Sequence, residues 1–347
     1  MKCNQINQAI IEAVIRKAEL LCPNSLALIG IYGSYATGDA HEKSDLDLLI
    51  LINDAQGRRL ANAFILDDAG IGYDLYCTDW ESLEKDADCN HAHLSKLMDS
   101  VIVYEKDPTA VPRLEALKNK VRFILASEKR FDKAYAALGC AKRAYADCIL
   151  SDTLALARTN AGLLIHYSLD ALMLFHGRYF QKGVKRTFEE LTALALPFDI
   201  EKLITKIITA ETPDAIRAES TELLRTVTAY LTVPVEKAAP NQGNLAGTYE
   251  EMFSNWRNKM HEATVRNDLF SSFMNAGSCQ HMLCEIADAV AIDPPDLMGD
   301  FAPDDLDKNA TSFDDALQQY LKEYQNVGIA PQRFTDIQAF QKAYLQA

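Results

Sequence analysis

The sequence predicts an α+β fold with two unequal parts, a small head built on a mixed sheet and a larger all-α helical bundle. Short apolar segments of strand length, separated by glycine and turn residues, are confined to the head. After Pro108 the strand signals nearly vanish, and Ala, Leu, Glu, Lys and Arg dominate, which favours helices. We expect a head over 1–107, a helical domain over 108–292, and a linker with short C-terminal helices over 293–347.

Helices and strands alternate in the head. Apolar residues at helical spacing predict a first helix over 6–21, and the apolar run 26–32 predicts a strand buried on both faces. Further strands are expected at 44–52, 70–78 and 101–104, and helices at 58–68 and from Trp80, with Asp79 as its N-cap residue. These elements suffice for a small sheet covered by helices.

The rest of the chain is predicted to be a succession of helices. They are expected near 111–126, 128–150, 152–176, 186–195, 199–209, 213–230, 246–262 and 268–291. An acidic stretch after Pro294 predicts the linker, and two short helices are expected from Phe313 and from Asp336.

Composition and charge exclude several classes of protein. With 35 basic and 49 acidic residues the net charge is −14, whereas proteins that hold long nucleic acids normally offer a basic surface, so we expect no long nucleic acid as partner. No apolar run approaches the roughly 18 residues of a membrane span, and the N-terminus lacks the pattern of a secretory signal. We therefore expect a cytoplasmic protein with no membrane partner, whose negative charge suits a cationic substrate.

The eight cysteines do not form a C-x-x-C pair, and we expect reduced thiols. Two segments, 89–93 and 279–284, contain both cysteine and histidine. Neither spacing matches a zinc finger or ribbon, so a structural zinc site is not expected.

Two aspartates two residues apart form the most informative pattern. Because side chains alternate along a strand, Asp45 and Asp47 point to the same face. Neighbouring carboxylates repel each other and are costly to bury unpaired, so a cation is expected between them, and oxygen ligands favour Mg²⁺ or Mn²⁺. Asp74, flanked by apolar residues on a later predicted strand, is the expected third carboxylate.

Gly33 and Ser34 precede these aspartates, directly after a predicted strand and at the start of a short helix. Glycine lets the backbone approach a phosphate closely, the N–H groups of a helix start attract anions, and Ser34 adds a hydroxyl donor. A phosphate-binding turn beside a two-metal carboxylate site indicates phosphoryl transfer.

Gly33-Ser34, then ten residues, then Asp45-Leu46-Asp47 and the later Asp74 resemble the DNA polymerase β-type nucleotidyltransferase superfamily over about the first hundred residues. The resemblance implies that Gly33 and Ser34 bind nucleotide phosphates and that the three aspartates are catalytic and hold the metal. The small head before a large helical body resembles the antibiotic (aminoglycoside and lincosamide) nucleotidyltransferases. That likeness implies transfer of a nucleoside monophosphate, AMP from the co-substrate ATP, to a hydroxyl of a small molecule, with release of pyrophosphate and a possible homodimer.

Enzymes of this arrangement often take a general base and a triphosphate-binding lysine from the second domain. The basic segment 177–186 resembles loops of the antibiotic-modifying enzymes, and we expect Lys182 and Lys185 to hold the triphosphate.

One helix of the body carries a stripe of four residues at four-residue spacing, Arg158, Gly162, His166 and Asp170. Either Asp170 or His166 acts as a base or grips a substrate amine, or the whole stripe faces water.

Arg257 and His261 faintly resemble the Arg…His pair of HEPN ribonucleases, helical domains often partnered with minimal nucleotidyltransferases. Only three residues separate this pair, where that family usually has four to six, so a helix-surface pair is the favoured interpretation.

Three alternatives compete with transfer onto a small molecule. One is transfer to a hydroxyl of a partner protein, as in antitoxin-like nucleotidyltransferases, and another is a non-catalytic nucleotide-binding regulator. The presence of all three carboxylates argues against the regulator. A glycosyltransferase, which also uses Asp-x-Asp, is disfavoured because that fold needs a long nucleotide-sugar-binding region before the motif, and only 44 residues precede Asp45.

Overall fold

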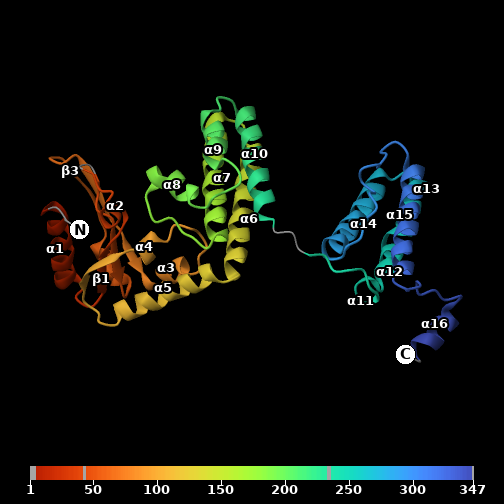
Figure 1. Ribbon diagram of the computed structural model, residues 1–347, viewed down its shortest axis with the longest axis horizontal. Helices are drawn as coiled ribbons and strands as arrows, with labels where there is room; N and C mark the ends of the chain where they lie inside the picture. The colour runs from red at the N-terminus through yellow and green to blue at the C-terminus, as the bar shows by residue number, and fades with distance from the viewer. Residues whose placement is uncertain (1–4, 42–43, 233–235, 346–347) are drawn as a thin grey trace. The chain divides into compact units, whose positions relative to one another are not determined.

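The computed structural model describes residues 5–41, 44–232 and 236–345 (Figure 1). The chain divides into two compact units, residues 1–233 and 234–347. This division falls inside the range 108–292 that we expected as one helical domain. Residues 1–4, which include Cys3, lie outside the described residues. The expectation of no secretory signal rests partly on them.

The first unit begins with a mixed sheet. Its strands are β1 (Leu26–Ile31), β2 (Leu48–Ile52), β5 (Cys77–Asp79) and β6 (Val101–Glu105), in the order β5-β2-β1-β6. Strand β1 runs antiparallel to both β2 and β6, whereas β2 and β5 are parallel. The expected small mixed sheet is therefore confirmed.

The two faces of this sheet enter different cores because successive side chains of a strand point to opposite sides. From β2, Leu48, Ile50 and Ile52 pack with helix α1 (Gln5–Leu21), while Leu49 and Leu51 join a larger core with the helices that follow. All five side chains of β2 are at most 4% exposed. Their burial explains the uninterrupted apolar run in the sequence.

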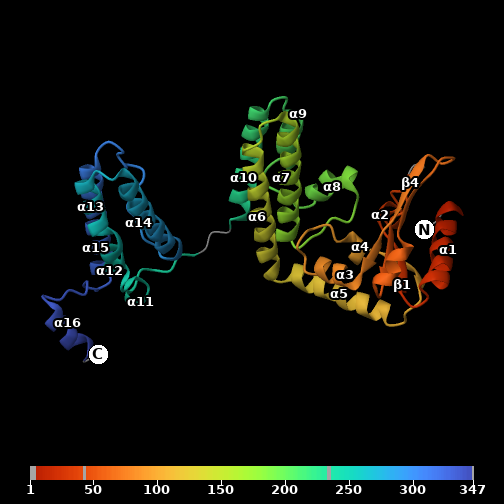
Figure 2. The same cartoon turned by 180° about the vertical axis from the view of Figure 1, so that it is seen from behind.

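The helical body of the first unit shares its core with the head. Leu28 and Leu49 of the sheet belong to the same buried cluster as Leu125 and Leu172 of the helices. Figures 1 and 2 show the sheet, the long helix that leads away from it and the helix bundle as successive parts of this unit. Packing across the boundary expected near residue 107 therefore joins the head and the helices that follow it.

The helices of the first unit that follow β5 are α3 (Trp80–Asp86) and α4 (Ser95–Met98), which precede β6, and then α5 (Ala110–Ala126), α6 (Lys129–Ile149), α7 (Leu154–Phe175), α8 (Thr187–Thr192), α9 (Ile200–Thr209) and α10 (Pro213–Leu231). Asp79 caps α3 as expected, accepting a 2.9 Å hydrogen bond from the backbone N–H of Ser82. The second unit contains α11 (Gln242–Leu245), α12 (Thr248–Met252), α13 (Asn258–Arg266), α14 (Leu269–Ala289), α15 (Leu306–Asn326) and α16 (Ile337–Tyr344).

The expected helix over 58–68 is wrong. A 3₁₀ turn over Ala55–Leu60, capped by Asp54, is followed by strand β3 (Asn62–Leu66), which pairs antiparallel with β4 (Ile71–Leu75). The ring of Phe64 stacks on Tyr73 across this hairpin at 5.3 Å, a cross-strand contact that local helix propensity does not reveal.

The expected strand over 70–78 also differs, because it splits into β4 and β5. Strand β5 joins the main sheet, whereas β4 belongs to the separate hairpin. Asp74 therefore lies on the hairpin and not on the central sheet.

The described cysteines are all free. Within the described ranges no helix has both the length and the apolar character needed to cross a membrane.

Candidate active site

The short helix α2 (Gly33–Thr37) starts directly after β1 and brings the glycine-serine turn beside Asp47. Gly33 has φ +64°, and a Cβ atom at this position would lie 1.9 Å from Oδ2 of Asp47. A side chain is therefore excluded twice, by the left-handed backbone and by the carboxylate. The turn and the second aspartate of the motif form one continuous site.

Asp45 and Asp47 lie in extended backbone just before β2. The pairing with β1 continues here, since the N–H of Tyr32 donates a 3.1 Å hydrogen bond to the carbonyl of Asp47. Leu46 between them is 2% exposed and packs into the core beside α1. Asp45 is exposed and Asp47 is half-buried, on the side away from Leu46.

The charges of the three aspartates all act on the phenol of Tyr32. Burial, and after it the charges of Asp47, Asp45, Asp74 and Asp86, together raise the pKa of this half-buried group to about 12. Asp74 is an exposed residue on β4, and its field reaches the same hydroxyl as the motif aspartates. Tyr32 is a site residue that the sequence analysis missed, although it directly precedes Gly33.

The donor set fits a hard divalent cation. Burial and, after it, the neighbouring charge of Asp45 together raise the pKa of Asp47 to about 6. This is the unfavourable electrostatics that a bound cation relieves, and carboxylate oxygens are the ligands that Mg²⁺ and Mn²⁺ prefer. Within the described part of the chain, the ligand atoms of the three carboxylates do not all lie within 4.8 Å of one another.

We expect Asp47→Asn to stabilise the metal-free protein at pH 7. The folded-state pKa of about 6 lies above the ordinary aspartate value of 3.8, so this carboxyl stabilises the fold below pH 4 and loses that contribution as the pH rises through 6. The variant should gain at most about 3 kcal/mol at pH 7 over the parent and little at pH 4. Urea unfolding with a chelator measures both, and a gain independent of pH would contradict this electrostatic origin.

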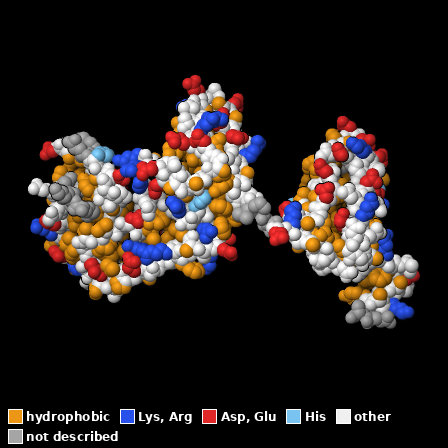
Figure 3. Space-filling view, in the orientation of Figure 1, with side chains coloured by type: hydrophobic (Ala, Val, Ile, Leu, Met, Phe, Trp, Pro, Cys, Tyr) orange, Lys and Arg blue, Asp and Glu red, His pale blue; other side chains and the backbone are white. Residues whose placement is uncertain are grey.

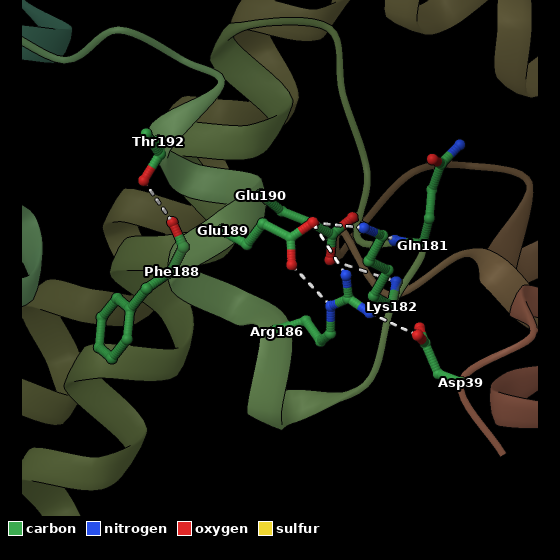
Figure 4. A network of polar contacts seen from close by, with 8 residues as sticks. All are labelled: Asp39, Gln181, Lys182, Arg186, Phe188, Glu189, Glu190 and Thr192. Carbon is green, nitrogen blue, oxygen red and sulfur yellow. Dashed lines mark hydrogen bonds and ion pairs between the residues drawn. The ribbon is translucent and has the colours of Figure 1, made fainter.

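The basic segment lies against the head, next to α2. Arg186 forms an ion pair with Asp39, which follows α2, and a second with Glu189, from Nε to Oε2 at 2.6 Å (Figure 4). Nζ of Lys182 lies 2.6 Å from the same Glu189, and Lys185 is exposed. Arg186 and Asp39 were not predicted, although Arg186 directly follows Lys185 in the basic run.

Beside this network the body contains a pocket of about 400 Å³. Glu190 fixes its rim by accepting hydrogen bonds from the backbone N–H groups of Gln181 at 2.8 Å and Lys182 at 3.2 Å. Its lining carries charges of both signs, from Arg178, Lys182, Glu189 and Glu190. On the face shown in Figure 3 the coloured basic and acidic side chains are likewise interspersed.

The stripe on α7 divides into two environments. Arg158, Gly162 and His166 are exposed, whereas Asp170 is 1% exposed and accepts a 2.9 Å hydrogen bond from the N–H of Ala92. In the second unit, Arg257 and His261 both contact Asp314 of α15, with Nε and Nε2 at 2.9 and 3.0 Å from its carboxylate oxygens. That pair is therefore engaged by an acidic partner.

Comparison with known proteins agrees with the motif. Residues 14–92 match the family model described as a nucleotidyltransferase domain. A nucleotidyltransferase-like protein from Exiguobacterium sibiricum is similar in structure, at 16% identity and a TM-score of 0.38, over 80% of this chain and 92% of that one. Among curated proteins none matches this chain.

The matched range contains the glycine-serine turn, the paired aspartates and Asp74. These are the residues on which the resemblance to this superfamily rests, and the structure surrounds them with a mixed sheet followed by helices. Residues 14–92 are therefore a nucleotidyltransferase domain.

Proposed function

We propose that this enzyme transfers AMP from ATP to a hydroxyl group of a small, positively charged molecule and releases pyrophosphate. The observation that carries the proposal is the contact at Gly33, where a Cβ atom would lie 1.9 Å from Oδ2 of Asp47. A phosphate-binding turn in direct contact with a metal-binding carboxylate suits a nucleoside triphosphate bound through its phosphates and a divalent ion together.

Asp45, Asp47 and Asp74 would hold Mg²⁺ or Mn²⁺. When bound, the metal would supply neutralisation of phosphate charge and a lower pKa for the attacking hydroxyl. The raised pKa of Asp47 supports this assignment, because a carboxylate destabilised by burial and a like charge gains most from a cation. Asp74 is exposed and is our candidate to take the proton from the acceptor hydroxyl.

Lys182 and Lys185 would hold the triphosphate, and Arg186 joins them as a candidate. The ion pair between Arg186 and Asp39 supports this proposal, because it brings the basic segment against the loop that follows α2. Glu189 now neutralises both Lys182 and Arg186. A triphosphate would replace Glu189 as their partner, since its charge is larger and its oxygens accept several charge-assisted hydrogen bonds.

The pocket beside this network supports a cationic acceptor. Glu189 and Glu190 line the pocket. Glu189 becomes available to an amine of the acceptor when Lys182 and Arg186 bind phosphate in its place. A volume of about 400 Å³ lies within the range that small-molecule sites occupy. An aminoglycoside-like molecule, with several hydroxyls and amines, has the required chemistry.

Pyrophosphate release tests the proposal. The enzyme is mixed with each of the four nucleoside triphosphates, Mg²⁺, and pools of aminoglycosides or lincosamides. N-acetylated aminoglycosides, which keep the hydroxyls and lose the charge, are the matched control. We expect release with ATP and an amine-bearing pool only. Equal release with the acetylated pool would overturn the cationic acceptor, and tight Mg·ATP binding without release would favour a protein hydroxyl as acceptor.

We expect Lys182→Ala to raise the KM for ATP about tenfold with a smaller effect on kcat. A charge-assisted hydrogen bond contributes about 1.5–3 kcal/mol, and the loss of the competing Glu189 pair offsets part of it. Lys85→Ala is the control, since Nζ of Lys85 also lies 2.6 Å from a glutamate, on the surface of α3. Steady-state kinetics measure both variants, and equal KM values would remove Lys182 from the triphosphate site.

A further inference from the structure

A second group of metal-ligating side chains lies between the head and α7, apart from the three aspartates. It consists of His93, His166 and Asp170, whose ligand atoms all lie within 4.8 Å of one another. His166 and Asp170 are one turn apart on α7, while His93 comes from the loop between α3 and α4. Among the described residues, these are the three histidine, cysteine, aspartate or glutamate side chains whose ligand atoms lie this close together.

The separations of the ligand atoms are of the size found around one ion, with each histidine next to a different oxygen of Asp170. Nε2 of His93 lies 3.5 Å from Oδ1 of Asp170, and Nε2 of His166 lies 3.6 Å from Oδ2. Good N–H···O hydrogen bonds are about 2.7–3.2 Å long, so both separations are too long for strong direct bonds. Tetrahedral coordination with bonds of about 2.0–2.2 Å places neighbouring ligand atoms about 3.3–3.6 Å apart.

The surroundings orient the carboxylate and pack the histidine rings. Asp170 is 1% exposed, and the N–H of Ala92 donates a 2.9 Å hydrogen bond to its Oδ1, which orients the carboxylate. The ring of His93 stacks on His166, with centroids 4.9 Å apart and an interplanar angle of 2°, and on Phe180 at 5.0 Å. Because an imidazole binds a metal in the plane of its ring, one of the exposed histidine rings turns when both bind the same ion. The N–H of Phe180 in turn donates to the carbonyl of Ala92 at 2.8 Å, so the basic segment supports the same loop.

The burial differs among the three ligands in a way that suits an accessible site. The side chains of His93 and His166 are 47% and 44% exposed, whereas the carboxylate lies beneath them. An ion can enter from solvent, meet two imidazoles and reach a buried negative charge. Three protein ligands also leave a fourth position of a tetrahedral ion for water.

We propose that His93, His166 and Asp170 form a site for a divalent transition metal of the Zn²⁺ class, joining the loop after α3 to helix α7. Imidazole nitrogen favours Zn²⁺ and its neighbours over Mg²⁺, so the two metal sites of this chain differ in chemistry. The ion clamps the head to the helical body, because its ligands come from both. The site is independent of the proposed nucleotide chemistry.

Zn²⁺ titration of tag-free, chelator-treated protein in excess Mg²⁺ tests this site, because Mg²⁺ competes at the carboxylates of the head. We expect one equivalent of Zn²⁺ per chain in calorimetry and a rise in Tm. With Co²⁺ as the probe, we expect a visible spectrum typical of four- or five-coordinate nitrogen and oxygen ligation. His93→Gln and His166→Gln should each weaken binding by at least about 10–100-fold, the loss that even an outer-sphere partner of a metal ligand produces.

His281→Gln is the matched control, because Nε2 of His281 also lies 3.5 Å from a glutamate one turn along its helix. Asp47→Asn is the second control, and both variants should keep the full equivalent. Stoichiometric Zn²⁺ that survives both histidine substitutions, or that disappears in Asp47→Asn, would overturn the assignment. An octahedral Co²⁺ spectrum in the parent protein would do so without any variant, and circular dichroism of the metal-free variants checks that they fold.

Discussion

Replacing Asp47 by Asn, alone or together with Asp45→Asn, is expected to lower the rate of nucleotidyl transfer by about 10³-fold or more. Metal-supported neutralisation of phosphate charge contributes several kcal/mol to such a reaction, and each 1.36 kcal/mol is a factor of ten in rate. Pyrophosphate release at saturating ATP and Mg²⁺ measures the loss. Tight binding of Mg²⁺ should fall in parallel.

The control for this result is Asp68→Asn, an exposed aspartate in the turn between β3 and β4. It removes the same charge from the head without touching the three carboxylates. Because the metal-free Asp47→Asn protein is expected to be more stable than the parent at pH 7, unfolding would not explain its inactivity. Full activity of the double variant would show that the head is not the catalytic site.

Substituting Gly33 by Ala is expected to lower activity by about 100-fold or more. The added Cβ would lie 1.9 Å from Oδ2 of Asp47, so the carboxylate must move, and a displacement of about 1 Å at a reacting site can cost a factor of 100. The left-handed backbone adds a loss of about 1–2 kcal/mol in unfolding free energy. Kinetics and urea unfolding measure the two effects separately.

Gly38→Ala provides a matched control at the other end of α2. Gly38 also has a left-handed backbone, with φ +79°, but among the described residues no atom beyond its own chain neighbours lies within 4 Å of its added Cβ. This variant should lose a similar amount of stability and keep most of its activity. Equal activities of the two variants would mean that the contact between Gly33 and Asp47 does not matter for transfer.

The sequence predicted well those features whose cause is local. Strand β2 is buried on both faces, so its whole length is apolar, and just before it the buried Leu46 alternates with the more exposed Asp45 and Asp47. The cap at Asp79 and the long helices of the body likewise depend on residues a few positions apart. The glycine-serine turn and the paired aspartates lie within 15 residues of one another, so their chemistry was visible in one segment.

The hairpin shows where local patterns fail. Residues 62–66 form a strand because they pair with β4, and Phe64 stacks on Tyr73 across the turn. The local sequence around either residue does not predict this pairing. The same pairing takes β4 out of the central sheet and carries Asp74 with it. The sequence pattern over 70–78 does not reveal that these residues form two strands in different sheets.

By itself the sequence determined the α+β class, the nucleotidyltransferase head and the carboxylate chemistry, because strand period, glycine and paired aspartates are properties of neighbouring residues. Only the tertiary structure decided which distant residues meet. Asp39 joins Arg186 across 147 positions, and the backbone of Ala92 joins Asp170 across 78. Such contacts follow from how the sheet and α7 pack around their shared core. This packing is stabilised by many weak apolar contacts between distant residues, which cannot be predicted from any single segment of the chain.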